Sequence, residues 1–136
     1  MTNHLAYLGL GSNLGERREL IRKAVALISE RIGAVTRQSS LIETEPWGFE
    51  SSHKFLNAVI LCETSLPPRQ LLEKTQQIER ELGRKKKSKA GNYADRAIDI
   101  DILLYDDLEV DEPDLKIPHP LMHERDFVMI PLNEIM

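Results

Sequence analysis

The sequence predicts an α+β fold, a ferredoxin-like βαββαβ sandwich with an extra β-hairpin and a short C-terminal helical tail. Two segments carry apolar residues at three- and four-residue spacing, as amphipathic helices do, and four apolar runs have the composition of strands. Two of these runs follow each other directly between the helices, which differs from the strict alternation of a parallel α/β sheet. With 136 residues, the chain is expected to form a single domain over residues 1–136.

The first elements are a strand, a glycine-containing connection and a helix. Residues 6–10 form a short apolar run, and glycines at positions 9, 11 and 15 surround its end. Such glycines also occur in dinucleotide-binding turns, but here the second strand does not follow in the βαβ order that those folds require. We interpret the glycines as a tight turn between strand and helix that lets the backbone approach a neighbour or ligand. Apolar residues over 20–32 mark the helix, which Gly33 ends.

Two strands come next, separated by a loop with two large aromatic residues. Residues 34–42 and 57–64 are the predicted strands. The intervening segment 43–54 is rich in residues that break strands, yet it carries a Trp and a Phe. Loops that carry large aromatic residues often close over a ligand.

A second helix is predicted over residues 68–82. Two prolines open it and Gly83 ends it. Segment 84–96, which follows, is basic at first and then contains Gly and Asn, as loops do.

The fourth strand and the tail complete the prediction. Residues 97–105 form the fourth strand, and residues 108–110 are predicted to fold back on it as a hairpin. Four prolines interrupt the remaining chain, so only a short helical stretch at residues 121–125 is expected.

Composition limits the classes of partner and compartment. The 18 basic and 22 acidic residues give a net charge of −4, which disfavours extended binding to nucleic acids or anionic membranes. The single cysteine, Cys62, lies in an apolar run and is interpreted as a core thiol. We expect neither a signal peptide nor a membrane span. A soluble protein of the reducing cytoplasm is therefore predicted.

Two acidic residues, Asp99 and Asp101, stand in the most apolar run of the chain. Because side chains alternate along a strand, both carboxylates point to one face. The opposite, core face is then filled by Ile98, Ile100, Ile102 and Leu104. A cation would relieve the repulsion between the carboxylates, and oxygen ligands suit Mg²⁺ held together with substrate phosphates. From the pair alone, the solvated acidic face of an edge strand is an equally good interpretation.

A basic run precedes the acidic strand. It contains Arg84, Lys86 and three further lysines, and Arg96 lies three residues before Asp99. In isolation such a run is usually a solvated loop. Beside a dicarboxylate metal site, Arg and Lys can neutralise phosphate oxygens during group transfer. Glu79, one turn before the end of the second helix, can reach or orient this loop.

Phe55, Asn57 and Phe127 are candidates for holding a planar heterocycle. Aromatic rings stack on such a ring, and an amide both donates and accepts hydrogen bonds. Plain core packing is the alternative for the same residues. His119, which two prolines flank, is either a phosphate contact or a polar turn residue.

Together these segments resemble the 6-hydroxymethyl-7,8-dihydropterin pyrophosphokinase family of folate biosynthesis. The resemblance covers nearly the whole chain and rests on the order and spacing of motifs at residues 9–13, 55–57, 79–84, 96–104, 117–120 and 124–127. It implies Mg²⁺-dependent transfer of the β,γ-diphosphate of ATP to the pterin hydroxymethyl oxygen, with release of AMP. The implied partners are small-molecule substrates, with no nucleic acid and no membrane, and the chain is expected to be a monomer.

The resemblance also implies roles for individual residues. Asp99 and Asp101 would hold two Mg²⁺ ions, and with Arg84 and Arg96 they form the implied catalytic set. The implied contacts to ATP, the co-substrate, are Gln76, Glu79, Arg84, Lys86, Tyr93, Arg96, His119 and Arg125. The implied pterin pocket consists of Thr44, Pro46, Trp47, Phe55, Asn57, Asp99 and Phe127. Where the family commonly has Trp-Gly-Pro-Arg before the acidic strand, this chain has Tyr-Ala-Asp-Arg at 93–96.

Two alternatives belong to other classes of protein. A non-catalytic ferredoxin-like module that senses a small ligand would keep the fold and the aromatic pocket but would not need a metal. An RNA-binding sheet could use the basic run at 84–89. RNA-recognition sheets display aromatic residues on their central strands, however, whereas the exposed strand face here carries acids.

Overall fold

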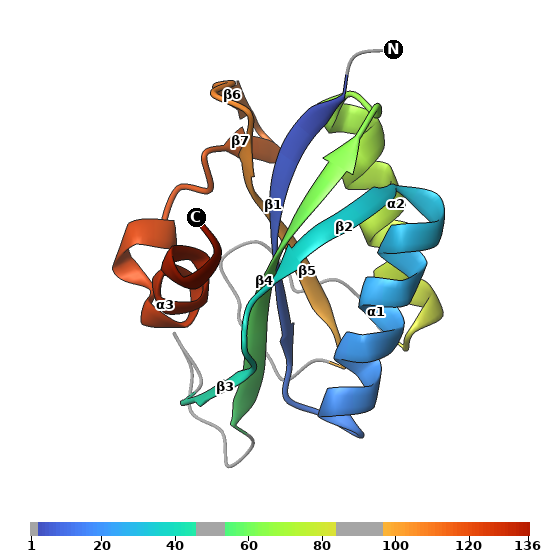
Figure 1. The fold of residues 1–136 in the computed structure, drawn as a ribbon, viewed down its shortest axis with the longest axis vertical. Helices are drawn as coiled ribbons and strands as arrows, with labels where there is room; N and C mark the ends of the chain where they lie inside the picture. Colours follow the sequence, from blue (N-terminus) through green and yellow to red (C-terminus); the bar gives the residue numbers. More distant parts are fainter. Residues whose placement is uncertain (1–2, 46–53, 84–96) are drawn as a thin grey trace.

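The computed structural model describes residues 3–45, 54–83 and 97–136. In chain order, its helices and strands are β1 (His4–Ser12), α1 (Arg17–Arg31), β2 (Gly33–Gln38), β3 (Ile42–Thr44), β4 (Phe55–Thr64), α2 (Pro68–Glu81), β5 (Asp99–Tyr105), β6 (Val110–Glu112), β7 (Leu115–Ile117), the short 3₁₀ helix η1 (Met122–Glu124) and α3 (Asp126–Ile135). The main sheet is antiparallel in the order β2-β4-β1-β5, with β3 also paired to β4, while β6 and β7 form a separate pair. Helices lie on both faces of the main sheet (Figure 1).

One face of the main sheet packs against α1 and α2. Alternate residues of β1 point to this face, and Leu8 is fully buried there. The apolar faces of the two predicted helices form the other side of the core, with Ile21 and Ile28 from α1 and Ile78 from α2. Burying each such side chain contributes about 1.5–3 kcal/mol. Both predicted helices are confirmed, with ends close to the predicted glycines.

The opposite face carries α3, which is longer than the predicted helical stretch of the tail and follows it in the chain. Val128, Leu132 and Ile135 recur at helical spacing and pack on Val59 of β4. The short helical stretch predicted at 121–125 is present as η1, but the expectation that the tail contains only this stretch was wrong. Pro131 lies inside α3 and removes one backbone donor, but the packing of the apolar face on the sheet outweighs that loss.

A bulge interrupts the alternation of β5. Tyr7 pairs with Leu104 while Leu8 pairs with Ile102, so Leu103 is an extra residue on β5. Ile98, Ile100 and Ile102 fill the face toward α1 and α2, as predicted. Beyond the bulge, Leu104 packs in the cluster under α3, so its predicted place on the core face with the isoleucines was wrong.

Two further predictions about strands need correction. The predicted strand 34–42 consists of two strands, β2 and β3, which both pair with β4. Residues 39–41 lie between them, and the hydroxyl of Ser39 accepts a hydrogen bond from the Val59 N–H at 2.9 Å. The predicted hairpin return at 108–110 was also wrong, because β6 pairs with β7 and not with β5. Arg69 of α2 pairs with Glu112 and Asp114, and thereby connects the β6–β7 pair to the helix.

Gly33 is the first residue of β2 as well as the end of the helical segment. It pairs with Thr64 of β4. A Cβ atom at this position would lie 1.9 Å from the backbone oxygen of Glu63, far inside van der Waals contact. The close approach of β2 and β4 therefore requires a glycine here.

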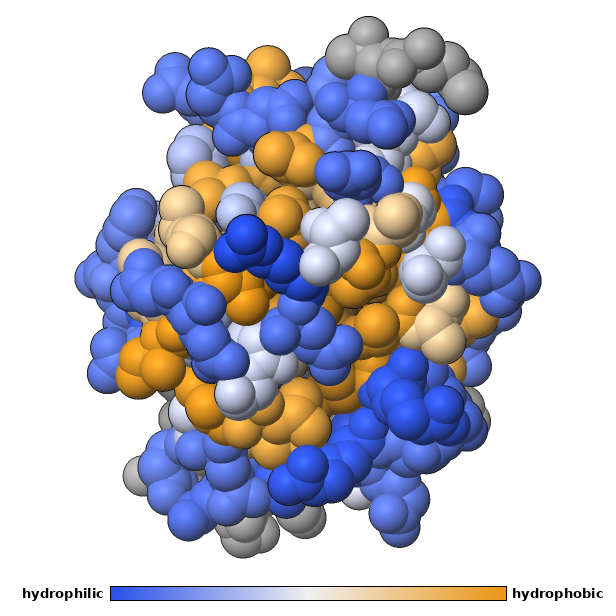
Figure 2. All heavy atoms as spheres, in the orientation of Figure 1, coloured by the Kyte–Doolittle hydropathy of each residue, from blue (hydrophilic) through white to orange (hydrophobic). Residues whose placement is uncertain are grey.

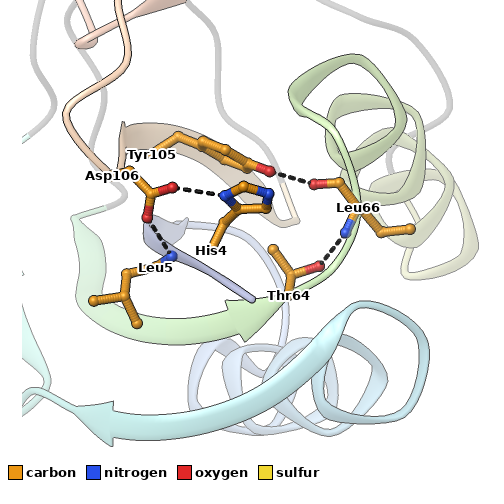
Figure 3. Close-up of polar contacts among 6 residues, drawn as sticks. All are labelled: His4, Leu5, Thr64, Leu66, Tyr105 and Asp106. Carbon is orange, nitrogen blue, oxygen red and sulfur yellow. Dashed lines mark hydrogen bonds and ion pairs between the residues drawn. The ribbon is translucent and has the colours of Figure 1, made fainter. Parts of the chain in front are cut away.

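A cluster of polar contacts around Asp106 joins the beginning of β1 to the end of β5 (Figure 3). Oδ1 of Asp106 accepts a hydrogen bond from the Leu5 N–H at 2.7 Å, and Oδ2 lies 2.7 Å from Nδ1 of His4. The His4 ring stacks on Tyr105 at a centroid distance of 5.0 Å, and the Tyr105 hydroxyl donates to the Leu66 carbonyl at 2.6 Å. These contacts tie the beginning of β1 to the end of β5 and to the segment before α2. The Leu5 N–H and His4 hold the pKa of the Asp106 carboxyl below its usual value.

We expect Asp106→Ala to lower the free energy of unfolding at pH 7 by about 1–2 kcal/mol, because two hydrogen bonds are lost. Residue 106 has φ of +50°, a conformation that Asp and Asn tolerate better than Ala. Because folding lowers the pKa of Asp106, its contribution is present above about pH 4 and disappears as the pH falls through the folded-state pKa. Urea unfolding measures the change.

Asp106→Asn is the matched control, since its amide oxygen can still accept a hydrogen bond from the Leu5 N–H. Its free energy of unfolding should fall by less than that of Asp106→Ala. An alanine variant as stable as the parent would contradict the expectation.

The burial of Cys62 and the hydropathy of the surface are as the composition led us to expect. Cys62 is fully buried in the core, and burial raises the pKa of its thiol to about 11, as expected for a core thiol. Figure 2 shows that hydrophilic side chains surround and interrupt the apolar ones on the face in view. None of the helices in the described segments combines the length and the apolar character needed to cross a bilayer.

Candidate functional site

Asp99 and Asp101 lie on the face of the sheet that carries α3. Asp99 is in line with Asn57 across the sheet, with only a glycine between them. Asp99 of β5 pairs with Gly11 of β1, and Gly11 pairs on its other side with Asn57 of β4. Residues paired in this way point to the same face. Because Gly11 has no side chain, the space between Asn57 and Asp99 is open. Asp101 is the next residue of β5 on this face and pairs with Gly9, above which the side chain of Leu103 packs.

This opening is a pocket, which we call the first pocket. Its residues come from β1, β3, β4, β5 and the beginning of α3. Predicted site residues that line it are Thr44, Phe55, Asn57, Asp99, Asp101, Arg125 and Phe127. The structure therefore brings together residues from four distant segments, including both acids and both phenylalanines.

The backbone of β1 forms the floor of the first pocket at Gly9 and Gly11, two glycines that were predicted to lie in a turn. Gly9 and Gly11 lie within β1, so only Gly15, with φ of +73°, belongs to the predicted turn. A Cβ atom on Gly11 would lie 3.0 Å from Oδ1 of Asn57 and 3.5 Å from Phe55. The signal for this role was the spacing of two glycines within a strand, which places both on one face.

The orientation of the Asn57 amide is set by Thr44. Asn57 is 3% exposed, and its Nδ2 donates to the Thr44 hydroxyl at 2.7 Å. This bond directs Oδ1 toward the floor at Gly11. The amide can therefore accept a hydrogen bond from an N–H group of a flat ligand in the first pocket.

Arg125 and Phe127 enter the first pocket from the beginning of α3. Arg125 is 6% exposed, and its guanidinium carbon lies 5.5 Å from the centre of the Phe127 ring, in cation–π contact. Phe55 lines the same pocket from β4. Two aromatic rings and a buried positive charge therefore border one cavity.

A second pocket lies along the outer edge of β5, between α2 and the β6–β7 pair. Its lining includes Leu72, Ile100, Asp101, Leu115, Lys116 and His119. Asp101 lines both pockets and so lies at their junction. A ligand in one pocket and a ligand in the other would meet at this carboxylate.

His119 is a neutral, partly buried imidazole at the second pocket. Burial, and secondarily the charge of Arg125, lower its pKa to about 4, although Asp99 acts in the opposite direction. Its backbone N–H donates to the Leu103 carbonyl at 3.0 Å. Within the described part of the chain, Nδ1 of His119 is buried and has no hydrogen-bond partner. A neutral ring with such a nitrogen can bind a polar ligand atom at pH 7.

Glu79 and Gln76 are on α2, and neither is among the described residues that line the two pockets. Glu79 is buried, and its Oε2 accepts a hydrogen bond from the Ile100 N–H at 2.8 Å. Gln76 is half-buried. The remaining predicted site residues lie outside the described segments, namely Pro46, Trp47, Arg84, Lys86, Tyr93 and Arg96.

The donor set suits a magnesium ion that phosphates also bind. Asp99 and Asp101 are half-buried, share one face of β5 and line the same pocket. No group of three or more His, Cys, Asp or Glu residues with metal-binding geometry occurs in the described segments. One or two carboxylates, completed by phosphate oxygens and water, are the usual protein environment of Mg²⁺ in phosphoryl transfer.

The family model for 7,8-dihydro-6-hydroxymethylpterin-pyrophosphokinase (HPPK) matches residues 7–136. A 2-amino-4-hydroxy-6-hydroxymethyldihydropteridine pyrophosphokinase of Porphyromonas gingivalis is 51% identical over 132 residues, covering 96% of this chain and 90% of that protein. An enzyme of the same name from Bacillus subtilis is 46% identical over 134 residues, covering 98% of this chain and 78% of that protein.

Solved structures show a similar fold. One HPPK-DHPS in complex with substrates has a TM-score of 0.79 at 14% identity, over 99% of this chain and 40% of that one. The wild-type HPPK-DHPS of Plasmodium falciparum with SDX-DHP has a TM-score of 0.75 at 15% identity, over 98% of this chain and 41% of that one. The present chain thus spans about two fifths of these longer chains. The matches in sequence confirm the resemblance seen in the motifs, and the chain belongs to the 7,8-dihydro-6-hydroxymethylpterin-pyrophosphokinase family.

Proposed function

We propose that this chain transfers the diphosphate group of ATP to the hydroxymethyl oxygen of 6-hydroxymethyl-7,8-dihydropterin, a step of folate biosynthesis, and releases AMP. The observation that carries the proposal is the position of Asp101, which borders both pockets beside Asp99. Membership of the family and the names of relatives at 46–51% identity support the activity. A purely ligand-sensing module would have no need for two carboxylates at this junction.

In this proposal the pterin occupies the first pocket. Phe55 and Phe127 hold the two faces of the ring, and Asn57 bonds its polar edge while Thr44 fixes the amide. Pro46 and Trp47 complete the proposed pocket. Stacking and directed hydrogen bonds orient the hydroxymethyl group toward the carboxylates, so that positioning supplies much of the rate enhancement.

ATP occupies the second pocket in the same proposal. His119 lines this pocket and is proposed to donate a hydrogen bond to a phosphate as a neutral imidazole. Arg125 lines the first pocket, and its guanidinium is proposed to neutralise the phosphates where the two pockets meet. The other proposed ATP contacts are Gln76, Arg84, Lys86, Tyr93 and Arg96. Of these, Arg84 and Arg96 also belong to the proposed catalytic set, because cations near the transferring group stabilise its developing charge. The resemblance also implied Glu79, but its carboxylate is buried and bonded to the Ile100 N–H.

Two Mg²⁺ ions are proposed to bind at Asp99 and Asp101. When bound, they would supply charge neutralisation to the phosphates and to the accepting oxygen. The carboxylates themselves fix the place where the two substrates meet. Asp101, next to the hydroxymethyl group in this arrangement, can also take the proton that the accepting hydroxyl loses.

The identity of the nucleotide product tests the proposed function. The protein is incubated with ATP, Mg²⁺ and 6-hydroxymethyl-7,8-dihydropterin, and the products are separated by chromatography and followed by phosphorus NMR. We expect equal amounts of AMP and of a pterin carrying two phosphates. A reaction without pterin is the control for ATP hydrolysis. ADP as the nucleotide product, or no turnover, would refute the proposal.

The finer organisation is also proposed. A ferredoxin-like βαββαβ core over a single domain of residues 1–136 is supported by the order β2-β4-β1-β5, in which β1 and β4 are central. We further propose that the chain acts as a monomer in the cytoplasm on small-molecule substrates alone. Sedimentation analysis of the purified protein tests the monomer.

A further inference from the structure

Beyond the proposed function, on which this inference rests, we propose that Glu79 is a positioning residue that fixes the stretch of β5 carrying Asp99 and Asp101. Its carboxylate does so through the backbone of Ile100, the residue between the two acids. Oε2 of Glu79 accepts the Ile100 N–H at 2.8 Å, and the Glu79 side chain is only 6% exposed. This role differs from the nucleotide contact that the motif implied.

The need for such an acceptor follows from the position of β5 in the sheet. Among the described strands, β5 is an edge strand with β1 on one side. Alternate N–H groups of an edge strand point away from the neighbouring strand and require another partner. Because the Ile100 N–H bonds to Glu79, the N–H groups directed toward β1 are those of Asp99 and Asp101. The carboxylate from α2 takes the place of a missing neighbouring strand.

A second contact fixes the same edge on the other side of Asp101. The carbonyl of Leu103, the extra residue of the bulge, accepts the backbone N–H of His119 at 3.0 Å. Residues 100 and 103 are therefore both bonded to groups outside the sheet. Between these contacts lies Asp101, the carboxylate shared by the two pockets.

The energetic reason for a glutamate at this place is specific. A buried carboxylate is unfavourable unless hydrogen bonds compensate its desolvation, and a hydrogen bond to a charged acceptor is about twice as strong as a neutral one. An apolar side chain at position 79 of α2 would leave the Ile100 N–H without this acceptor. A displacement of about 1 Å in a catalytic group can lower a rate about 10²-fold.

Amide hydrogen exchange at Ile100 is the direct test, because it needs no substrate or metal. Exchange of the Ile100 amide is measured by NMR in the unsubstituted chain, in Glu79→Leu and in Glu79→Gln. We expect protection in the unsubstituted chain, a loss of about 10²-fold in Glu79→Leu, and retention in Glu79→Gln, whose amide oxygen still accepts. Glu73→Leu, at an exposed position of the same helix, is the matched control and should leave the Ile100 amide unchanged. Rapid exchange in the unsubstituted chain would overturn the proposal without any variant.

Steady-state kinetics separate positioning from nucleotide binding. For Glu79→Leu we expect kcat to fall about 30- to 100-fold while the KM for ATP changes less than about threefold. Glu79→Gln should recover most of kcat. A higher KM for ATP with an unchanged kcat would overturn the proposal in favour of direct nucleotide contact. Full activity of Glu79→Leu, in an assay where the unsubstituted chain forms AMP, would refute the positioning role and leave the proposed function intact. Absence of AMP formation by the unsubstituted chain would instead refute the proposed function.

Discussion

Asp101→Asn is expected to lower kcat by about 10³-fold or more, because it removes a charged oxygen ligand and a charge next to the transferring group. Asp99→Asn should have a similar effect. Both carboxylates are half-buried on one face of β5, and Asp101 borders both pockets. Asparagine keeps the size and the strand geometry but binds Mg²⁺ far more weakly. AMP formation at saturating ATP and pterin measures the change.

The fold should survive either substitution. Neutralising one of two like charges on the same face reduces repulsion, so the free energy of unfolding should change by less than about 1 kcal/mol. Asp107→Asn, in the exposed turn after β5, is the matched control and should retain full activity. Loss of folded protein in the Asp101 variant would indicate a structural role for the pair. Unchanged turnover in both variants would contradict the proposed metal site.

Gly33→Ala is expected to lower the free energy of unfolding by about 3 kcal/mol, near the upper end of the range for overpacked sites. The added Cβ would lie 1.9 Å from the Glu63 carbonyl oxygen and 3.0 Å from the Cα of Thr64. Both contacts are to backbone, so relief requires β2 to move away from β4. Urea denaturation followed by circular dichroism measures the loss.

Gly9→Ala is the matched control for stability. In the described part of the chain, the nearest atoms to a Cβ on Gly9 belong to the side chain of Leu103 at 3.5 Å, which is ordinary contact. Its free energy of unfolding should stay within about 1 kcal/mol of the parent, since alanine also suits an extended strand better than glycine does. If Gly33→Ala is as stable as Gly9→Ala, the close approach of β2 and β4 is not a constraint on the fold.

Local periodicity predicted the features that depend on neighbouring residues. The period of two along β5 correctly places Asp99 and Asp101 together, opposite Ile100. Helical spacing correctly predicts α1 and α2. These predictions succeed because the faces of a helix or strand follow from its geometry alone.

The incorrect sequence-based predictions concern features that contacts between distant segments determine. Leu104 is on the unexpected face because the bulge at Leu103 arises from pairing with β1, which no local pattern encodes. Helix α3 forms despite Pro131 because Val128 and Leu132 bury against β4, a strand that is distant from α3 in sequence. The partner of Glu79 could not be predicted either, because a backbone N–H on a distant strand leaves no trace in the sequence.

The backbone floor at Gly9 and Gly11 has a consequence for inhibitors. A planar compound lying on this floor would rest on main-chain atoms of β1, which hydrogen-bonds to neighbouring strands on both sides. Any replacement of Gly11 would place a carbon 3.0 Å from Oδ1 of Asn57, in the space that the natural substrate is proposed to share. Mutations of Gly11 that exclude an inhibitor should therefore also exclude the substrate. We expect resistance mutations at this position to be rare for that reason.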